Sequence, residues 1–136
     1  MKTKEKHLIF VYGTLREGYN NHIYLETSKW IDYAKTVNKY SLFEAGIPFV
    51  YKKLELTTIA GELYEVSDDV LYWIDMLEGH PNTYRREQVE IESGFTKKVV
   101  KAWLYFYPEK VGRIIESGDY EEAYPRRNNN VSAIKP

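Results

Sequence analysis

Apolar and polar positions along the chain alternate in a way that predicts a protein built mainly of β-strands. The run Leu8–Tyr12 is apolar on both faces, which is typical of a central strand covered on both sides. A turn at Asn38-Lys39 is expected to join the next two strands, and most connections are expected to be hairpins. The further strands are predicted over residues 30–37, 40–43, 56–66, 88–92 and 97–107.

One segment carries the periodicity of a helix. Ser67 can cap its N-terminus, and two Asp residues follow in the first turn, where the positive end of the helix dipole favours them. Gly79 is the expected C-cap, and Pro81 prevents continuation. Short helices are expected over residues 22–27 and 111–115. The apolar positions with helical spacing are Val70, Leu71, Ile74 and Leu77.

These elements predict one α+β, barrel-like domain of about six or seven strands with one main helix. The length of 136 residues fits a single domain, which we place over residues 1–124. Residues 125–136 are polar and rich in Asn, so they are expected to form a mobile C-terminal tail.

Composition excludes several classes of protein. The 19 Lys and Arg residues balance 20 Asp and Glu, which argues against a nucleic-acid or anionic-membrane partner. The absence of Cys excludes disulfides, zinc knuckles and thiol nucleophiles. No segment approaches the roughly 20 apolar residues of a membrane span, and no signal peptide is recognised. We therefore expect a cytoplasmic protein.

Two enzyme signatures can be tested directly. Gly13 and Gly18 have the spacing of a phosphate-binding loop, but Tyr19-Asn20 stands where that loop needs Lys and then Ser or Thr. The three His residues lie far apart in the sequence, so no metal site is predicted. The sequence does not favour nucleotide or metal chemistry.

Glu78 departs from the pattern of the main helix. It falls inside the apolar stripe, whereas Asp75 falls toward the edge of that stripe. Burial and the negative end of the helix dipole would both raise the pKa of Glu78, which is how a carboxyl group becomes a general acid or base near neutral pH. The alternative is a helix-end Glu that turns to solvent or bonds to Arg85 or Arg86.

The segment Gly13-Thr14-Leu15 is a second candidate. A strand that stops at Gly before a polar loop can present successive N–H groups that bind a carboxylate or an oxyanion. An ordinary turn is the alternative. The chain has 13 Tyr residues, which either pack in strands or line a pocket. The candidates for a pocket wall are Tyr12, Tyr64, Tyr84, Tyr105 and Tyr107.

A set of short motifs, in order, resembles the gamma-glutamylcyclotransferase-like family, which includes gamma-glutamylamine cyclotransferase and the AIG2-like proteins. No single motif is specific, but together they extend from residue 8 to about residue 120. The motifs are Tyr12-Gly13-Thr14-Leu15-Arg16 with Gly18, Asn21-His22 and Leu25; Gly61-Glu62-Leu63-Tyr64; Ile74-Asp75-Met76-Leu77-Glu78-Gly79; Tyr84-x-Arg86-x-x-Val89; Ala102-Trp103-Leu104-Tyr105; and Ser117-Gly118-Asp119-Tyr120.

The resemblance implies a small mixed β-barrel with flanking helices and a cofactor-independent acyl transfer. The α-amine of a small γ-glutamyl substrate would attack its own γ-carbonyl and release 5-oxoproline. Glu78 would be the catalytic acid and base. The substrate-binding residues would be Tyr12, Gly13, Thr14 and Leu15, with Tyr105 near the site. Tyr84 and Arg86 would belong to the architecture of the site.

Other interpretations remain open at this point. The same pocket could hold a small ligand without turnover, or support a related transfer or hydrolysis of another γ-glutamyl conjugate. A third interpretation is an interaction protein that uses Arg126 and Arg127 of the tail. The sequence leaves the amine side of the substrate and the oligomeric state undetermined.

Overall fold

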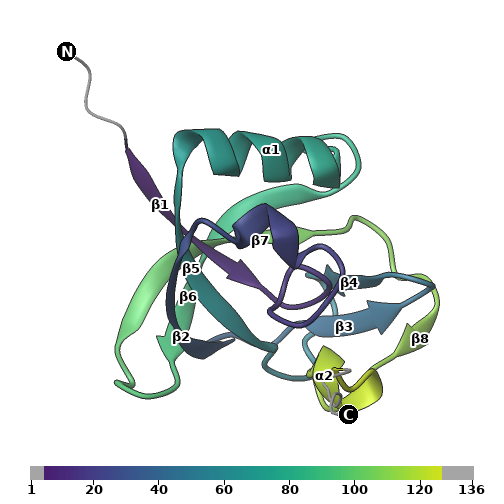
Figure 1. The fold of residues 1–136 in the computed structure, drawn as a ribbon. Helices are drawn as coiled ribbons and strands as arrows, with labels where there is room; N and C mark the ends of the chain where they lie inside the picture. The colour runs from purple at the N-terminus through teal and green to yellow at the C-terminus, as the bar shows by residue number, and fades with distance from the viewer. Residues whose placement is uncertain (1–4, 127–136) are drawn as a thin grey trace, which may run out of the picture.

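The predicted strands and main helix form in the computed structural model, which describes residues 5–126 (Figure 1). Within this range the chain has eight strands, one long helix and two short helical segments. The elements are β1 (Lys6–Val11), η1 (His22–Leu25), β2 (Lys29–Thr36), β3 (Ser41–Glu44), β4 (Pro48–Tyr51), β5 (Ala60–Ser67), α1 (Asp68–Glu78), β6 (Arg85–Ser93), β7 (Val99–Phe106), β8 (Arg113–Ile114) and α2 (Tyr120–Ala123).

Five of the strands close into a barrel. β1 pairs with β5, and the sheet continues through β2 and β6 to β7. β7 then pairs in parallel with β1 at Trp103 and Ile9, which completes the ring. The other three strands, β4, β3 and β8, extend the sheet from β7 beyond the ring. The predicted α+β barrel is confirmed.

The apolar residues form two buried clusters, one on each face of β1. Phe10 packs in the barrel interior with Leu63 and Leu104. Its neighbour Ile9 lies in the second cluster with Leu71 and Ile74 of α1, which lies across the outside of the barrel (Figure 1). Successive side chains of a strand point to opposite faces, so a run that is apolar on both faces fits a strand between two cores.

The main helix begins and ends where its caps predict. The Ser67 hydroxyl accepts the N–H of Val70, and Gly79 adopts the left-handed conformation (φ 70°) that ends the helix. Glu78 is the residue before this glycine, so the cap places the Glu78 side chain in the last turn of the helix. The opposite end of α1 follows β5 directly.

Two local predictions are wrong. The strands β2 and β3 do not form a hairpin, because β5 and β6 occupy both edges of β2 and leave none for β3. β3 pairs instead with β4, a short strand that the sequence did not reveal, and with β8. The helix expected over residues 111–115 is this strand β8, since Gly112 has a φ of 87° that interrupts a helix.

The expected tail lies mostly outside the described residues. Pro125 and Arg126 are described, and the Arg126 guanidinium reaches back to Glu62 of β5. Residues 127–136, including Arg127, are outside this range. The mobility of the tail therefore stays a prediction.

Candidate active site

A cavity of about 230 Å³ opens where the end of β1 meets the end of α1. Its wall is formed by the loop after β1, the start of β4, the last turn of α1, the residue that precedes β6, and β7. Glu78 lines it, together with the expected binding residues Tyr12, Gly13, Thr14, Leu15 and Tyr105. Of the other tyrosines considered for the pocket wall, Tyr84 lines the cavity, whereas Tyr64 and Tyr107 do not. The lining residues are Phe10, Val11, Tyr12, Gly13, Thr14, Leu15, Asn21, Ile47, Pro48, Leu77, Glu78, Tyr84 and Tyr105.

Glu78 is the acidic residue of this wall. Its side chain is partly buried, and no hydrogen bond or ion pair of its carboxylate occurs within residues 5–126. Burial raises the pKa of Glu78 from its ordinary 4.5 to about 7, because desolvation disfavours the charged form. The direction of this shift is the one that the helical pattern predicts, and burial is its cause.

Arg86 does not pair with Glu78, although the sequence left that open. Its Nε and Nη2 donate to Asp75 Oδ1 and Oδ2 at 2.7 and 3.0 Å, and its guanidinium lies 4.1 Å from the centre of the Trp103 ring. Burial alone would raise the pKa of Asp75, but the hydrogen bonds from Arg86 and Tyr105 outweigh it and lower that pKa. Asp75 is thus a fixed carboxylate.

Three tyrosines of the wall are oriented by their hydroxyl groups. Tyr12 donates to the carbonyl oxygen of Tyr105 at 2.8 Å, and Tyr84 donates to that of Pro48 at 3.1 Å. Tyr105 donates to Asp75 Oδ1 at 2.5 Å. Burial raises the pKa of each tyrosine, and the nearby charge of Glu78 adds to the increase. These phenols stay neutral near pH 7 and act as walls rather than bases.

The loop after β1 turns tightly against β4. A Cβ on Gly13 would lie 2.4 Å from Pro48 Cγ, so only glycine fits at this point. The Gly13 carbonyl accepts the N–H of Arg16 at 3.0 Å, and the Thr14 carbonyl accepts that of Asn21 at 3.0 Å. Asn21 Nδ2 also donates to Thr14 Oγ1 at 2.9 Å.

The N–H groups of this loop are available to a ligand. Those of Gly13, Thr14 and Leu15 donate to no acceptor in the part of the chain that the structure describes. Among the described residues that line the cavity, none is Lys or Arg. An anionic group in the cavity would therefore depend on neutral donors, among them these main-chain N–H groups.

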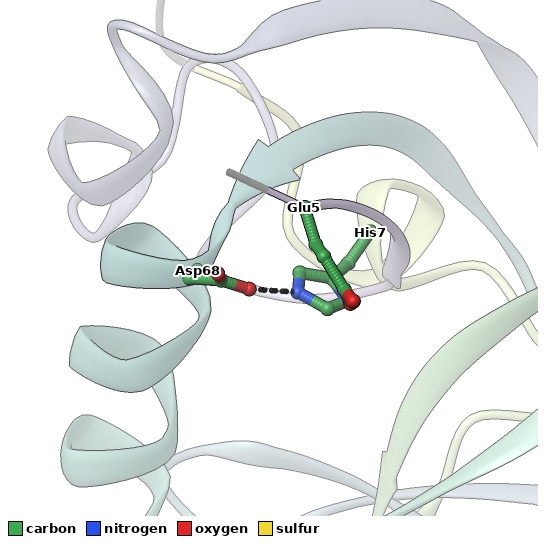
Figure 2. A group of neighbouring side chains, drawn as sticks. All are labelled: Glu5, His7 and Asp68. Carbon is green, nitrogen blue, oxygen red and sulfur yellow. Dashed lines mark hydrogen bonds and ion pairs between the residues drawn. The ribbon is translucent and has the colours of Figure 1, made fainter. Parts of the chain in front are cut away.

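One cluster of potential metal ligands lies away from the cavity. Figure 2 shows Glu5 and His7, at the start of β1, beside Asp68 in the first turn of α1. The ligand atoms of these three residues lie within 4.8 Å of one another. His7 Nε2 lies 2.5 Å from Asp68 Oδ1, and both carboxylates are exposed. The positive end of the α1 dipole disfavours a cation here. None of the three residues lines the cavity at the other end of the helix.

Sequence reasoning missed the partners that fix the site. Asp75 was assigned only to the edge of the apolar stripe, yet it orients both Tyr105 and Arg86. Its position one turn before Glu78 was the available signal, since residues three apart on a helix share a face. The fully buried Glu62, which lies behind the cavity loop, was also missed.

The chain is similar in sequence to proteins named as gamma-glutamyl cyclotransferases. Residues 9–122 match the family model described as gamma-glutamyl cyclotransferase, AIG2-like. A protein of Methanocaldococcus jannaschii named "Putative gamma-glutamylcyclotransferase" is 49% identical over 117 residues, which cover 84% of this chain and 95% of the relative. The gamma-L-glutamyl-butirosin B gamma-glutamyl cyclotransferase of Niallia circulans is 37% identical over 106 residues, covering 73% and 65% of the two chains.

The fold is shared with solved structures. The crystal structure of an AIG2-like protein from Mus musculus superposes with a TM-score of 0.76 at 27% identity. The match covers 92% of this chain and 99% of the mouse chain.

Among the described residues, no helix has the length and apolar character needed to cross a membrane.

Proposed function

The chain belongs to the gamma-glutamyl cyclotransferase, AIG2-like family, and we propose that it cyclises the γ-glutamyl group of a small conjugate and releases 5-oxoproline. The observation that carries this proposal is the unpaired Glu78 carboxyl, with a pKa of about 7, on the same cavity wall as the free N–H groups of residues 13–15. The Glu78 carboxyl would move a proton, and the N–H groups of residues 13–15 would bind an anionic group of the substrate.

The reaction exchanges one carbon–nitrogen bond for another. The α-nitrogen of the glutamyl group attacks the γ-carbonyl carbon, and a five-membered lactam forms. The bond from that carbon to the amine-side nitrogen then breaks, and the free amine leaves. The α-nitrogen, an ammonium group at first, loses two protons as it becomes the lactam N–H. The departing nitrogen gains two protons and leaves as an ammonium group, so no oxidant, reductant or cofactor is consumed.

Glu78 is suited to carry these protons one at a time. An α-ammonium group has an ordinary pKa of about 8, within about one unit of the Glu78 pKa. A transfer between groups so closely matched costs on the order of 1 kcal/mol, and the protonated carboxyl can then donate to the leaving nitrogen. A Glu with an ordinary pKa would be a poorer base for the same step.

The loop would orient the substrate rather than react with it. The α-carboxylate of the glutamyl group is the anion that the N–H groups of Gly13, Thr14 and Leu15 would bind. Holding that end in place curls the chain, so that the α-nitrogen approaches the γ-carbonyl. The nucleophile is already tethered to the electrophile, and orientation is the main remaining contribution. Tyr12 and Tyr105 would complete the wall of this pocket.

The proposal is tested with purified protein and a panel of γ-glutamyl conjugates. The panel includes γ-glutamyl amino acids, γ-glutamyl-ε-lysine and γ-glutamyl polyamines, with 5-oxoproline measured by chromatography. We expect release from at least one conjugate and a loss of about 10²–10⁴ in kcat for Glu78→Gln. Glu90→Gln, a change on an exposed position of β6, is the matched control and should retain full activity.

Two outcomes would change the assignment. Equal rates for the wild type and Glu78→Gln would remove Glu78 from the mechanism. A conjugate that binds tightly and is recovered intact after long incubation would favour the alternative function, a ligand-binding module that uses the same cavity.

A further inference from the structure

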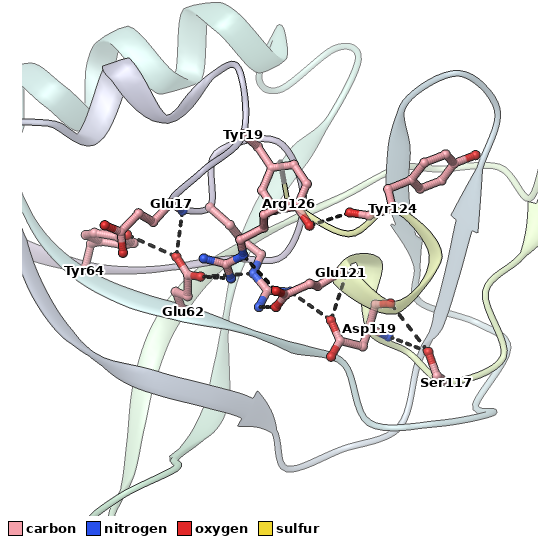
Figure 3. Close-up of polar contacts among 10 residues, drawn as sticks. Glu17, Tyr19, Glu62, Tyr64, Ser117, Asp119, Glu121, Tyr124 and Arg126 are labelled. Atoms are coloured by element: carbon pink, nitrogen blue, oxygen red, sulfur yellow. Dashed lines mark hydrogen bonds and ion pairs between the residues drawn. The ribbon is translucent and has the colours of Figure 1, made fainter. Parts of the chain in front are cut away.

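A fully buried carboxylate lies behind the cavity loop. Glu62 of β5 is 0% exposed, and its two oxygens accept four hydrogen bonds (Figure 3). Oε1 accepts the N–H of Glu17 and the hydroxyl of Tyr64, both at 3.0 Å. Oε2 accepts Arg16 Nε at 3.2 Å and Arg126 Nη2 at 2.6 Å. A buried charge needs such partners, and two of the four come from the residues that directly follow the cavity loop.

Arg16 connects this carboxylate to the C-terminal part of the chain. It is only 3% exposed, and its Nη1 lies 3.0 Å from Asp119 Oδ1. Its Nη2 lies 3.4 Å from Glu121 Oε1. Asp119 is also the N-cap of α2, where its side chain accepts the N–H of Glu121. The guanidinium therefore bridges β5 and α2.

Arg126 closes the cluster from the outside. Its Nε lies 3.1 Å from Glu121 Oε2, and its guanidinium lies 5.5 Å from the centre of the Tyr19 ring. The Arg126 side chain packs against Gly18, where a Cβ added to the glycine would lie 3.0 Å from Arg126 Cδ. Tyr19 in turn donates its hydroxyl to the Tyr124 carbonyl at 2.6 Å. Residues 16–19 are thus held between β5 and residues 119–126.

Arg126 supplies one of the two positive charges in this cluster, so its removal would raise the net charge of the cluster from −1 to −2. Two guanidinium groups face three carboxylates, those of Glu62, Asp119 and Glu121. Without Arg126, the side chain of Arg16 would be left to serve all three, and Glu62 would lose its shortest hydrogen bond. Arg16 is joined to Leu15 by one peptide bond, so the contacts that hold its side chain also restrict the main chain next to the cavity wall.

We infer that Arg126 is a positioning residue: through Glu62 and Arg16 it fixes the loop 13–15 whose N–H groups bind the substrate carboxylate. The inference rests on the proposed function, because it assigns the loop its role there. Arg126 touches neither the cavity nor the reacting atoms. Its contribution is to substrate binding, and it leaves the proton transfer at Glu78 unchanged.

The test compares Arg126→Met, which keeps the aliphatic stem, with Arg126→Lys, which keeps the charge. We expect KM for the best γ-glutamyl conjugate to rise at least about tenfold in Arg126→Met, with a much smaller change in kcat. Arg126→Lys should recover most of the loss. The pH profile of kcat should be the same in all three proteins. The control is Ile91→Val or Ile91→Ala in the barrel core, whichever matches the fall in Tm, and its KM should not change.

A second measurement does not depend on turnover. Amide hydrogen exchange at Arg16 and Asn21, whose N–H groups donate to the carbonyls of Gly13 and Thr14, should be faster in Arg126→Met and unchanged in the matched Ile91 variant. An unaltered KM together with unaltered exchange would overturn the inference while the proposed function stands. A wild-type protein that releases no 5-oxoproline from any conjugate would instead remove the proposed function, and the exchange measurement would then decide the positioning role alone.

Discussion

Replacing Glu78 with Gln should stabilise the protein at the same time as it abolishes activity. Burial raises the pKa of Glu78 from 4.5 to about 7. At neutral and alkaline pH the folded protein therefore holds a charged carboxylate in a desolvated position, which costs stability. A difference of this size corresponds to about 3 kcal/mol as an upper limit, since water and side chains relax around the charge. A Gln at this position carries no charge to desolvate.

The sign of the effect follows from proton binding. Between pH 4.5 and about 7 the native state holds the Glu78 proton more firmly than the unfolded chain does. The free energy of unfolding of the wild type therefore falls as the pH rises through this window. The Gln variant has no proton to lose at this position, so its free energy of unfolding does not fall in the same way. The difference in stability between the variant and the wild type is therefore smallest below pH 4.5, increases between pH 4.5 and about 7, and is largest above pH 7.

Urea unfolding of both proteins at about pH 5 and about pH 8 measures this difference. We expect Glu78→Gln to gain about 2 kcal/mol relative to the wild type between the two conditions, below the limit given above because the protein relaxes. Glu90→Gln is the control, because it makes the same substitution at an exposed position outside the cavity. An offset for Glu78→Gln that is the same at both pH values would refute the reasoning that burial raises the pKa of Glu78.

Two further substitutions probe the wall of the cavity. Gly13→Ala would place a Cβ 2.4 Å from Pro48 Cγ and displace the loop, so kcat/KM should fall at least about tenfold; a kinetically normal Gly13→Ala protein would contradict the loop's role in binding. Tyr105→Phe would remove one hydrogen bond to Asp75 and should lower the free energy of unfolding by about 1 kcal/mol. Denaturant titration checks this value, and an unchanged stability would show that the 2.5 Å contact contributes nothing.

The main helix could be predicted because its signals are local. Ser67 and Gly79 mark its ends, and the apolar spacing between them identifies the buried face. The same spacing places Glu78 among apolar positions, and the structure places it on the cavity wall. A departure from the pattern was therefore informative where every other feature of the segment agreed.

Strand pairing could not be predicted in the same way. The partners of a strand are chosen by contacts between distant segments, and a short turn such as Asn38-Lys39 does not decide them. Here both edges of β2 are taken by β5 and β6, and β1 closes the ring through a parallel contact with β7. The short strand β4, which supplies Pro48 to the cavity wall, depends on its neighbours β3 and β7.

The ion pairs of the site were beyond sequence reasoning for a related reason. Asp75 lies 11 residues from Arg86 and 30 from Tyr105, and Glu62 lies 64 residues from Arg126. Each acidic residue has several basic candidates in the chain, and only the closed barrel selects among them. Arg86 was considered as a partner for Glu78, yet the fold gives it to Asp75.

That selection bears directly on the chemistry. Three carboxylates are withdrawn from solvent around the cavity loop and the last turn of α1, and two of them, Glu62 and Asp75, have guanidinium partners. The third, Glu78, has none within the described range, and it is the one whose pKa burial brings close to 7. An Arg placed beside Glu78 would keep it ionised and weaken it as a base. The fold commits Arg16, Arg86 and Arg126 to the other two acids, and it leaves Glu78 without a guanidinium partner among residues 5–126. This arrangement supports the role proposed for Glu78 as the group that exchanges a proton with a bound amine.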